Sequence, residues 1–184
     1  MILLKKPGMQ GIMQLRYFGP DHVKVLDEAI SVSEDVISDY FSISSNYWVR
    51  NPYEVRTLRE ISSWEYPGEA FAHLVRYGKD ITQKQSGRDS RKFYRICLHD
   101  HNILDQTSGG KRERLLPFLI YVITHEFVHI MRFSRYFCHP EFNDRNVEEQ
   151  KVHLVTQDIL TPVKVRGLDT VLDRFLPHSQ LNKN

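Results

Sequence analysis

Three stretches of the chain carry hydrophobic residues in the pattern of an amphipathic helix, with apolar positions mostly three to four residues apart. They run from Pro20 to Phe41, from Arg114 to Phe133 and from Leu168 to Leu176, and a further helix is predicted between the last two, from Asn146 to Leu160. Proline is favoured at a helix start and disfavoured in its interior, so Pro117 is acceptable only in the first turn of the second helix. The helix from Asn146 should stop before Thr161 and Pro162.

Two segments rich in aromatic and aliphatic residues predict strands joined by a long hairpin connection, Phe71 to Tyr77 and Phe93 to His99. One face of the second strand carries Tyr94, Ile96 and Leu98, and the other carries Arg95, Cys97 and His99. We expect the first face to pack on helices and the second to be polar, because alternate residues face opposite sides. Another short strand is predicted at Tyr47 to Val49, before a turn or helix start at Asn51 and Pro52.

The organisation of the chain indicates one domain, because no repeat, low-complexity tract or linker divides residues 1–184. The two cysteines, Cys97 and Cys138, are far apart in sequence and have no CxxC spacing. They indicate neither a disulfide framework nor a cysteine-rich zinc knuckle. A reducing, cytoplasmic setting fits this composition best.

The charge balance excludes some partners. The formal net charge is +2, from 25 basic and 23 acidic residues, so no strong attraction to nucleic acid or anionic lipid is expected. The longest apolar run, Leu115 to Thr124, is shorter than the roughly 20 residues that cross a bilayer. The N-terminus has its apolar residues before its lysines, the wrong order for a secretory signal. We therefore predict a soluble protein without a membrane or nucleic-acid partner.

The most informative stretch is VITHEFVHIMRF, Val122 to Phe133, in which two histidines and a glutamate interrupt an apolar helix. Residues four apart on a helix lie one above the other, so His125 and His129 can both offer a ring nitrogen to one ion. Glu126 is then placed to accept a proton from a metal-bound water. This HExxH pattern predicts a zinc hydrolase site with Glu126 as general base.

Two other interpretations of these residues stay open. Neighbouring groups can satisfy two histidines and a glutamate inside a buried helix without a metal. Glu126 and His129 also form the Glu-x-x-His pair of di-iron bundles, but such bundles use the pair twice, and Gln150 stands three residues before His153. Burying three polar groups without partners is costly, which favours a metal.

A catalytic zinc needs a third protein ligand and keeps its fourth position for water. Arg132 and Arg135 stand where the extended motif HExxHxxGxxH requires glycine and histidine, which excludes the metzincin arrangement. Glu148 and Glu149, on the next predicted helix, are the leading candidates for the third ligand. The competing candidates are His139, His153, His99 and His101.

The stretch VITHEFVHIM resembles the longer zincin consensus, and its continuation resembles the gluzincin clan of zinc metallopeptidases. Within that clan, EEQKVHLVTQDILTP is similar to the third-ligand helix of the small cytoplasmic metallopeptidases that cleave bacterial repressors. In this register Glu149 takes the ligand position and Pro162 the closing proline. The resemblance covers Leu115 to Pro162, within a motif-bearing part at residues 90–165. It implies a zincin-like α+β fold, in which a small, mainly antiparallel sheet packs on the active-site helix and the third-ligand helix.

The resemblance also implies roles for other residues. In such enzymes an edge strand lies above the active helix and pairs with the substrate, which points to the strand from Phe93 to His99. Relatives carry Asn or Asp four residues after the ligand glutamate, where this chain has His153, and that position often orients a zinc-bound histidine. Tyr136, His139 and His153 are the candidates for stabilising an oxyanion.

These residues together predict a zinc metallopeptidase that hydrolyses a peptide or protein substrate. One Zn²⁺ would be held by His125, His129 and Glu149, and Glu126 would activate a zinc-bound water. Two alternatives are a zinc hydrolase of a non-peptide substrate, because one geometry serves several substrates, and a non-catalytic binding module stabilised by zinc.

Overall fold

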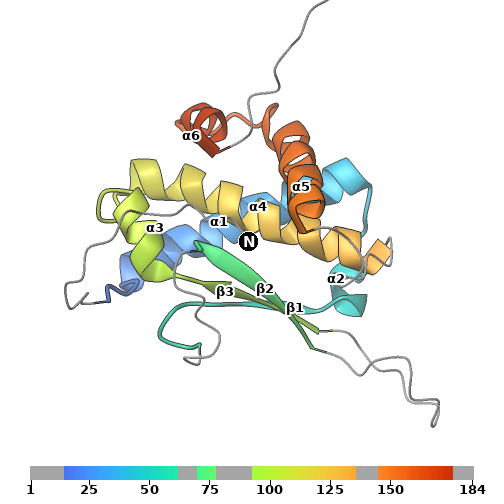
Figure 1. Cartoon of the computed structure of the whole chain (residues 1–184), viewed down its shortest axis with the longest axis horizontal. Helices are drawn as coiled ribbons and strands as arrows, with labels where there is room; N and C mark the ends of the chain where they lie inside the picture. Colours follow the sequence, from blue (N-terminus) through green and yellow to red (C-terminus); the bar gives the residue numbers. More distant parts are fainter. Residues whose placement is uncertain (1–14, 62–69, 78–92, 136–144, 176–184) are drawn as a thin grey trace, which may run out of the picture.

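A computed structural model describes residues 15–61, 70–77, 93–135 and 145–175 of the chain. Within these ranges it contains six helices and three strands (Figure 1). The helices are α1 (Pro20–Phe41), α2 (Asn46–Arg50), α3 (Asp100–Gln106), α4 (Arg112–Arg135), α5 (Arg145–Leu160) and α6 (Leu168–Phe175). The strands are β1 (Tyr53–Arg56), β2 (Ala72–Tyr77) and β3 (Phe93–Leu98). The predicted combination of helices with a small sheet is confirmed.

The sheet has the order β1-β3-β2, in which β3 pairs in parallel with β1 and antiparallel with β2. The predicted pairing of β2 with β3 is confirmed, but β1 makes the sheet mixed rather than mainly antiparallel. The prediction that the strand from Phe93 forms an edge is wrong, because β3 is the central strand. Within the described residues the two edges belong to β1 and β2.

Helix α4 lies at the centre of the molecule, with α1 alongside it, the sheet on one side and α5 and α6 on the other (Figure 1). One hydrophobic core joins these elements, and α4 contributes completely buried residues such as Leu119, Ile123 and Phe127. By length and composition alone, Arg112–Ser134 is apolar enough to cross a membrane, but 89% of its apolar window is buried inside the protein. Such burial is typical of the core helix of a soluble protein.

The boundaries of three predicted helices, those that form α1, α5 and α6, agree with the structure to within one residue. Helix α4 begins at Arg112, two residues before the predicted start, so Pro117 lies in its second turn and not in its first. The helix nevertheless continues, because proline there removes only one backbone hydrogen bond.

Gly110 precedes α4 with φ +81°, and a side-chain carbon there would lie 2.6 Å from Leu104 and 2.7 Å from His22. The turn before α4 therefore requires glycine.

The two faces of β3 differ less than the alternation predicts. Tyr94, Ile96 and Leu98 are completely buried in the core, as expected for the face that packs on helices. On the opposite face Arg95 forms an ion pair with Glu54 of β1, but Cys97 is also completely buried. The prediction of a polar second face is therefore right for Arg95 and wrong for Cys97.

The segment from Tyr47 to Val49 lies in α2 and does not form the predicted strand. Trp48 supplies the physical reason, because its ring packs 5.1 Å from that of Tyr53 and 5.0 Å from that of Phe127, measured between centroids. The strand follows instead as β1. Neither β1, with four residues, nor α3, with seven, is among the predicted elements, since such short elements have too few residues to establish a period.

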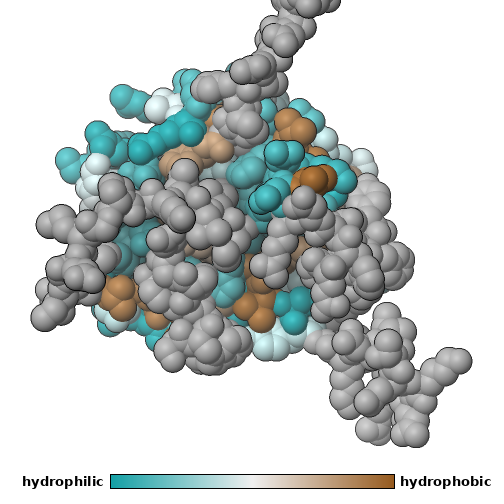
Figure 2. Space-filling view, viewed as in Figure 1, coloured by the Kyte–Doolittle hydropathy of each residue, from teal (hydrophilic) through white to brown (hydrophobic). Residues whose placement is uncertain are grey.

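The surface over α5 and α6 is largely hydrophilic, with hydrophobic residues in small separate patches (Figure 2). Val147 and Leu154 of α5 are 44% and 49% exposed. Singly exposed apolar residues of this kind are normal for a soluble protein.

Candidate metal centre

His125 and His129 of α4 converge with Glu149 of α5. Nε2 of His125 lies 3.4 Å from Oε2 of Glu149, and Nε2 of His129 lies 3.5 Å from Oε1 of the same carboxylate. One ligand atom from each of the three residues lies within 4.8 Å of the other two. The structure thus brings together the three side chains that the sequence singles out as ligands.

The separations between these atoms are comparable with those between the ligands of one zinc ion. Zinc binds histidine nitrogen at ~2.0–2.1 Å and carboxylate oxygen at ~2.0–2.2 Å, which puts two ligand atoms about 3.3–3.5 Å apart. The separations of 3.4 and 3.5 Å lie in that range, and they end on different oxygens of Glu149, so its carboxylate faces both histidines. Two imidazoles and one carboxylate also form a donor set that zinc uses in catalytic sites, with a fourth position left open.

Helical geometry explains how the two histidines share this site. They are one turn apart on α4, and their ring centroids are 4.9 Å apart. Both residues are buried, and the ring of His129 stacks on Phe133, one further turn along, at 5.7 Å. The apolar residues that flank the motif therefore form a wall that restricts the rotation of the imidazole rings.

Glu148 and Glu149 are adjacent but have different partners. The Arg132 guanidinium donates from Nε and Nη2 to the two carboxylate oxygens of Glu148, at 2.5 and 2.9 Å. These hydrogen bonds hold the pKa of Glu148 below its ordinary value despite partial burial. Since Glu148 is engaged by Arg132, Glu149 is the member of the pair that faces the histidines, in agreement with the register inferred from the sequence.

The charge state of the group suits a metal. Burial lowers the pKa of His125 to about 3, so its imidazole is neutral near pH 7. Burial opposes the ionisation of Glu149, but the contacts with His125 and His129 outweigh it and lower the pKa of this carboxyl. Metal ligands must be neutral imidazole and ionised carboxylate, and these are the forms that the surroundings of His125 and Glu149 favour.

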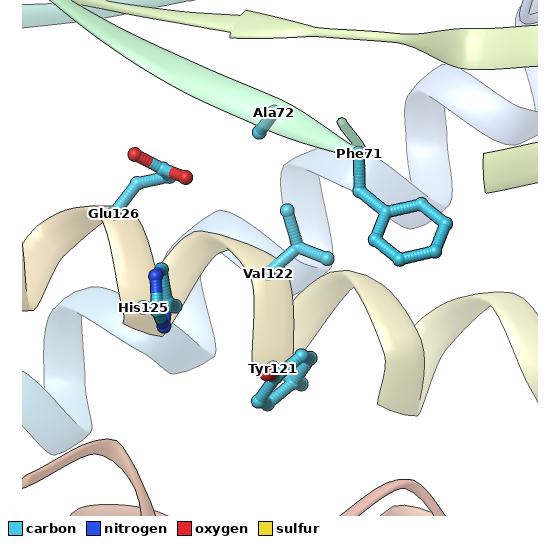
Figure 3. Close-up of a pocket in the computed structure, with 6 residues that line it drawn as sticks. All are labelled: Phe71, Ala72, Tyr121, Val122, His125 and Glu126. Atoms are coloured by element: carbon cyan, nitrogen blue, oxygen red, sulfur yellow. The ribbon is translucent and has the colours of Figure 1, made fainter. Parts of the chain in front are cut away.

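Glu126 follows His125 but lies outside the group of three. In Figure 3 its side chain extends from α4 toward Ala72, the first residue of β2. It is 7% exposed, and burial raises the pKa of its carboxyl. Within the described part of the chain no side chain or backbone donor forms a hydrogen bond with it, so its oxygens are available to a water molecule or a substrate.

A small cavity lies beside this carboxylate (Figure 3). It is lined by Phe71, Ala72, Tyr121, Val122, His125 and Glu126 and has a volume of about 10 Å³. One water molecule requires about 10–15 Å³ on this measure. The cavity thus matches the size of one water between the Glu126 carboxylate, the His125 ring and apolar walls.

The residue four positions after Glu149 is His153, where the resemblance to gluzincins predicts Asn or Asp. Its ring lies beside that of His125, with 4.8 Å between centroids, but its hydrogen bond joins Nδ1 to the hydroxyl of Tyr121 at 3.4 Å. The Nδ1 atoms of His125 and His129 are buried and have no hydrogen-bond partner among the described residues. His153 therefore does not orient His125 through a hydrogen bond, and burial lowers the pKa of its own ring.

Tyr121 is not among the residues predicted from the sequence, although the four-residue helical spacing that pairs His125 with His129 also points to it. It stands four residues before His125, so it lies on the same face of α4 one turn earlier. The role of Arg132 was not predicted either. Its position in the motif excludes a metzincin, but the sequence does not reveal its ion pair with Glu148.

The other histidines predicted as competing ligands have partners elsewhere or fall outside the structure. Nδ1 of His99 is 2.8 Å from the Ala70 carbonyl oxygen, and Nδ1 of His101 accepts the backbone N–H of Arg16 at 3.3 Å. Among the described residues only His125, His129 and Glu149 form a group that can share one ion. Tyr136 and His139 lie outside the described residues.

Comparisons of the chain with protein-family models, curated proteins and solved structures give no match. The resemblance to gluzincins therefore rests on the motif residues of α4 and α5.

Proposed function

We propose that the protein is a zinc-dependent metallopeptidase in which His125, His129 and Glu149 hold one Zn²⁺ and Glu126 is the general base. The observation that carries this proposal is the ligand spacing between the Glu149 carboxylate and the two Nε2 atoms, at 3.4 and 3.5 Å. When bound, zinc supplies a Lewis acid that lowers the pKa of a bound water and polarises the scissile carbonyl.

Glu126 is suited to move the protons of this reaction. It takes a proton from the attacking water and delivers it to the nitrogen of the leaving amine, so the carboxylate is restored after each turnover. Burial raises the pKa of this carboxyl and so makes the carboxylate a stronger base toward the attacking water. The apolar walls of Phe71 and Val122 keep bulk water away from the carboxylate.

The position of β2 favours a peptide over other substrates. β2 is an edge strand among the described residues, and its first residue, Ala72, lines the cavity beside Glu126. An extended peptide can pair with such an edge through its main chain, and this pairing brings its carbonyl groups along the cavity. We propose β2 for this role in place of β3.

A zincin-like fold and a cytoplasmic location belong to the same proposal. The fold is supported by the HExxH helix α4, which has the sheet on one side and the third-ligand helix α5 on the other. A non-catalytic zinc module is disfavoured because it has no use for the buried Glu126 carboxylate, which is costly to maintain beside the site.

The substitution Glu126→Gln tests the proposal. We expect zinc content, measured by plasma mass spectrometry, to stay at one ion per chain, while hydrolysis of quenched-fluorescent casein falls by about 100-fold or more. Asp158→Asn, an exposed acid on α5, is the matched control and should hydrolyse casein normally. A wild-type protein that cleaves neither casein nor a proteome-derived peptide library would contradict the peptidase assignment.

A further inference from the structure

Tyr121 and His153 form a link between α4 and α5 beside the proposed zinc ligands. The Tyr121 hydroxyl lies 3.4 Å from Nδ1 of His153, and the His153 ring lies 4.8 Å from the ring of His125. His153 is one helical turn after Glu149, and Tyr121 is one turn before His125. Both residues therefore extend the face of their helix that carries the proposed ligands.

The direction of this hydrogen bond follows from the burial of Tyr121. The residue is completely buried, and within the described part of the chain its hydroxyl has one partner, Nδ1 of His153. If the imidazole donated, no side chain or backbone group among the described residues would accept the phenolic hydrogen, which is unfavourable for a buried hydroxyl. Donation from the hydroxyl to Nδ1 satisfies both groups. The neutral ring of His153 must then carry its proton on Nε2.

The other side of the His153 ring is accessible. Nε2 has no hydrogen-bond partner among the described residues, and unlike Nδ1 of His125 and His129 it is not one of the buried unpaired nitrogens. The residue as a whole is half-buried. An N–H group held in this way, beside a ligand ring, is available to an acceptor on the substrate.

We propose that His153 donates a hydrogen bond from Nε2–H to the oxyanion that develops on the scissile carbonyl, and that Tyr121 is a positioning residue that fixes the tautomer of His153. The inference rests on the proposed function and extends it to the stabilisation of the transition state. A fixed donor in a partly buried site needs no rearrangement as charge develops. Asn or Asp at this position would accept a hydrogen bond from a ligand histidine, whereas His153 supplies a donor to the substrate.

The tautomer can be measured without any turnover. In long-range ¹H–¹⁵N spectra of the zinc-loaded, ¹⁵N-labelled chain, we expect His153 to be in the Nε2–H form, with its signals assigned by their loss in His153→Asn. Tyr121→Phe should shift these signals toward a mixture of tautomers. An Nδ1–H form in the wild type, or no change in Tyr121→Phe, would overturn the role of Tyr121.

Kinetics test the role of His153. His153→Asn should keep one zinc per chain and reduce kcat on quenched-fluorescent casein about 100-fold or more with little change in KM, the effect expected for one oxyanion donor. Tyr121→Phe should reduce kcat about tenfold with zinc retained. Leu154→Ala, an exposed neighbour on α5, is the control for packing and should keep wild-type rates.

The possible failures are distinguishable. If His153→Asn loses zinc, His153 serves the metal site and not the oxyanion, so the inference is wrong while the proposed function stands. If Glu126→Gln is inactive but His153→Asn retains full kcat, only the inference fails. If the wild type does not hydrolyse peptides at all, both the inference and the proposed function are overturned.

Discussion

Arg132 and Glu148 form an ion pair with two hydrogen bonds between α4 and α5, one position before the proposed ligand Glu149. Both side chains are mostly buried, with 16% and 10% of their surfaces exposed. Because the planar guanidinium fixes both oxygens of Glu148, it also fixes the rotation of α5 about its own axis. The neighbouring Glu149 is thereby directed toward His125 and His129.

Removal of this ion pair should therefore weaken both the fold and the metal site. We expect Glu148→Gln to lower the free energy of unfolding by about 2 kcal/mol at neutral pH, because the charge of Arg132 loses its partner in a partly buried position. Zinc affinity should fall about tenfold, as for other residues that support a ligand. Urea denaturation and zinc titration measure the two effects, with Asp158→Asn as the exposed control. Unchanged zinc affinity in Glu148→Gln would show that Arg132 does not position Glu149.

The ion pair also predicts a pH dependence of stability. The pKa of Glu148 is lowered in the folded protein from its ordinary value of 4.5, chiefly by the hydrogen bonds of Arg132. A lowered pKa contributes stability above the unfolded value, and this stability is lost as pH falls through the folded value. The stability difference between wild type and Glu148→Gln should stay constant from about pH 6 to 8 and shrink below about pH 4. A difference that persists undiminished at about pH 3 would contradict this assignment.

Zinc should stabilise the folded chain. A ligand at about 1,000 times its Kd adds about 4 kcal/mol, which for a domain of this size raises Tm by about 10 °C. Scanning calorimetry with saturating zinc and with a chelator measures the shift. In His129→Ala the shift should largely disappear, since one of the three ligands is missing. An equal shift in this variant would place the zinc elsewhere.

Phe127 should be essential for the packing between α4 and the segment that contains α2 and β1. It is completely buried, and its ring lies 5.0 Å from Trp48 and 4.8 Å from Tyr53. Phe127→Ala should reduce the free energy of unfolding by about 3–5 kcal/mol through lost burial and a new cavity. Val49 is 71% exposed, so the control substitution Val49→Ala should change the free energy of unfolding by less than about 0.5 kcal/mol. Similar values for the two variants would contradict the packing described.

Ala72 tests the use of the small cavity beside Glu126. A leucine at this position would fill the space of about 10 Å³ that, under the proposed function, holds the attacking water. We expect Ala72→Leu to reduce casein hydrolysis at least tenfold while the zinc content stays at one per chain. Val75→Leu adds a methylene group on the opposite face of β2 and is the control. Full activity in Ala72→Leu would exclude the cavity from the reaction.

The long elements could be predicted from the sequence because their own residues determine them. Helix α4 has a continuous apolar period, and its HExxH residues share a face by helical geometry alone. The central position of β3 could not be predicted, because it depends on pairing with β1, whose four residues each lie 41 positions before their partners in β3. Short elements such as α2 are decided by tertiary contacts like those of Trp48, which leave no period in the sequence.

The residues of the candidate site also fall into those that the sequence predicts and those that depend on packing between helices. His125, Glu126 and His129 follow from local spacing, and Glu149 follows from the register of a resemblance. The contacts of Arg132 with Glu148 and of Tyr121 with His153 cross from α4 to α5. They depend on how two helices pack against each other, and no pattern within either helix specifies that arrangement.

The central claim is that one zinc ion is held by two histidines of α4 and one glutamate of α5. The most direct test is anomalous scattering at the zinc absorption edge on crystals of the purified protein, together with the same measurement on Glu149→Ala. We predict one peak per chain, bound by Nε2 of His125, Nε2 of His129 and the Glu149 carboxylate, and no peak in the variant. The claim would be contradicted by a peak at other residues, by a fourth protein side chain that closes the coordination, or by a peak that persists unchanged in Glu149→Ala.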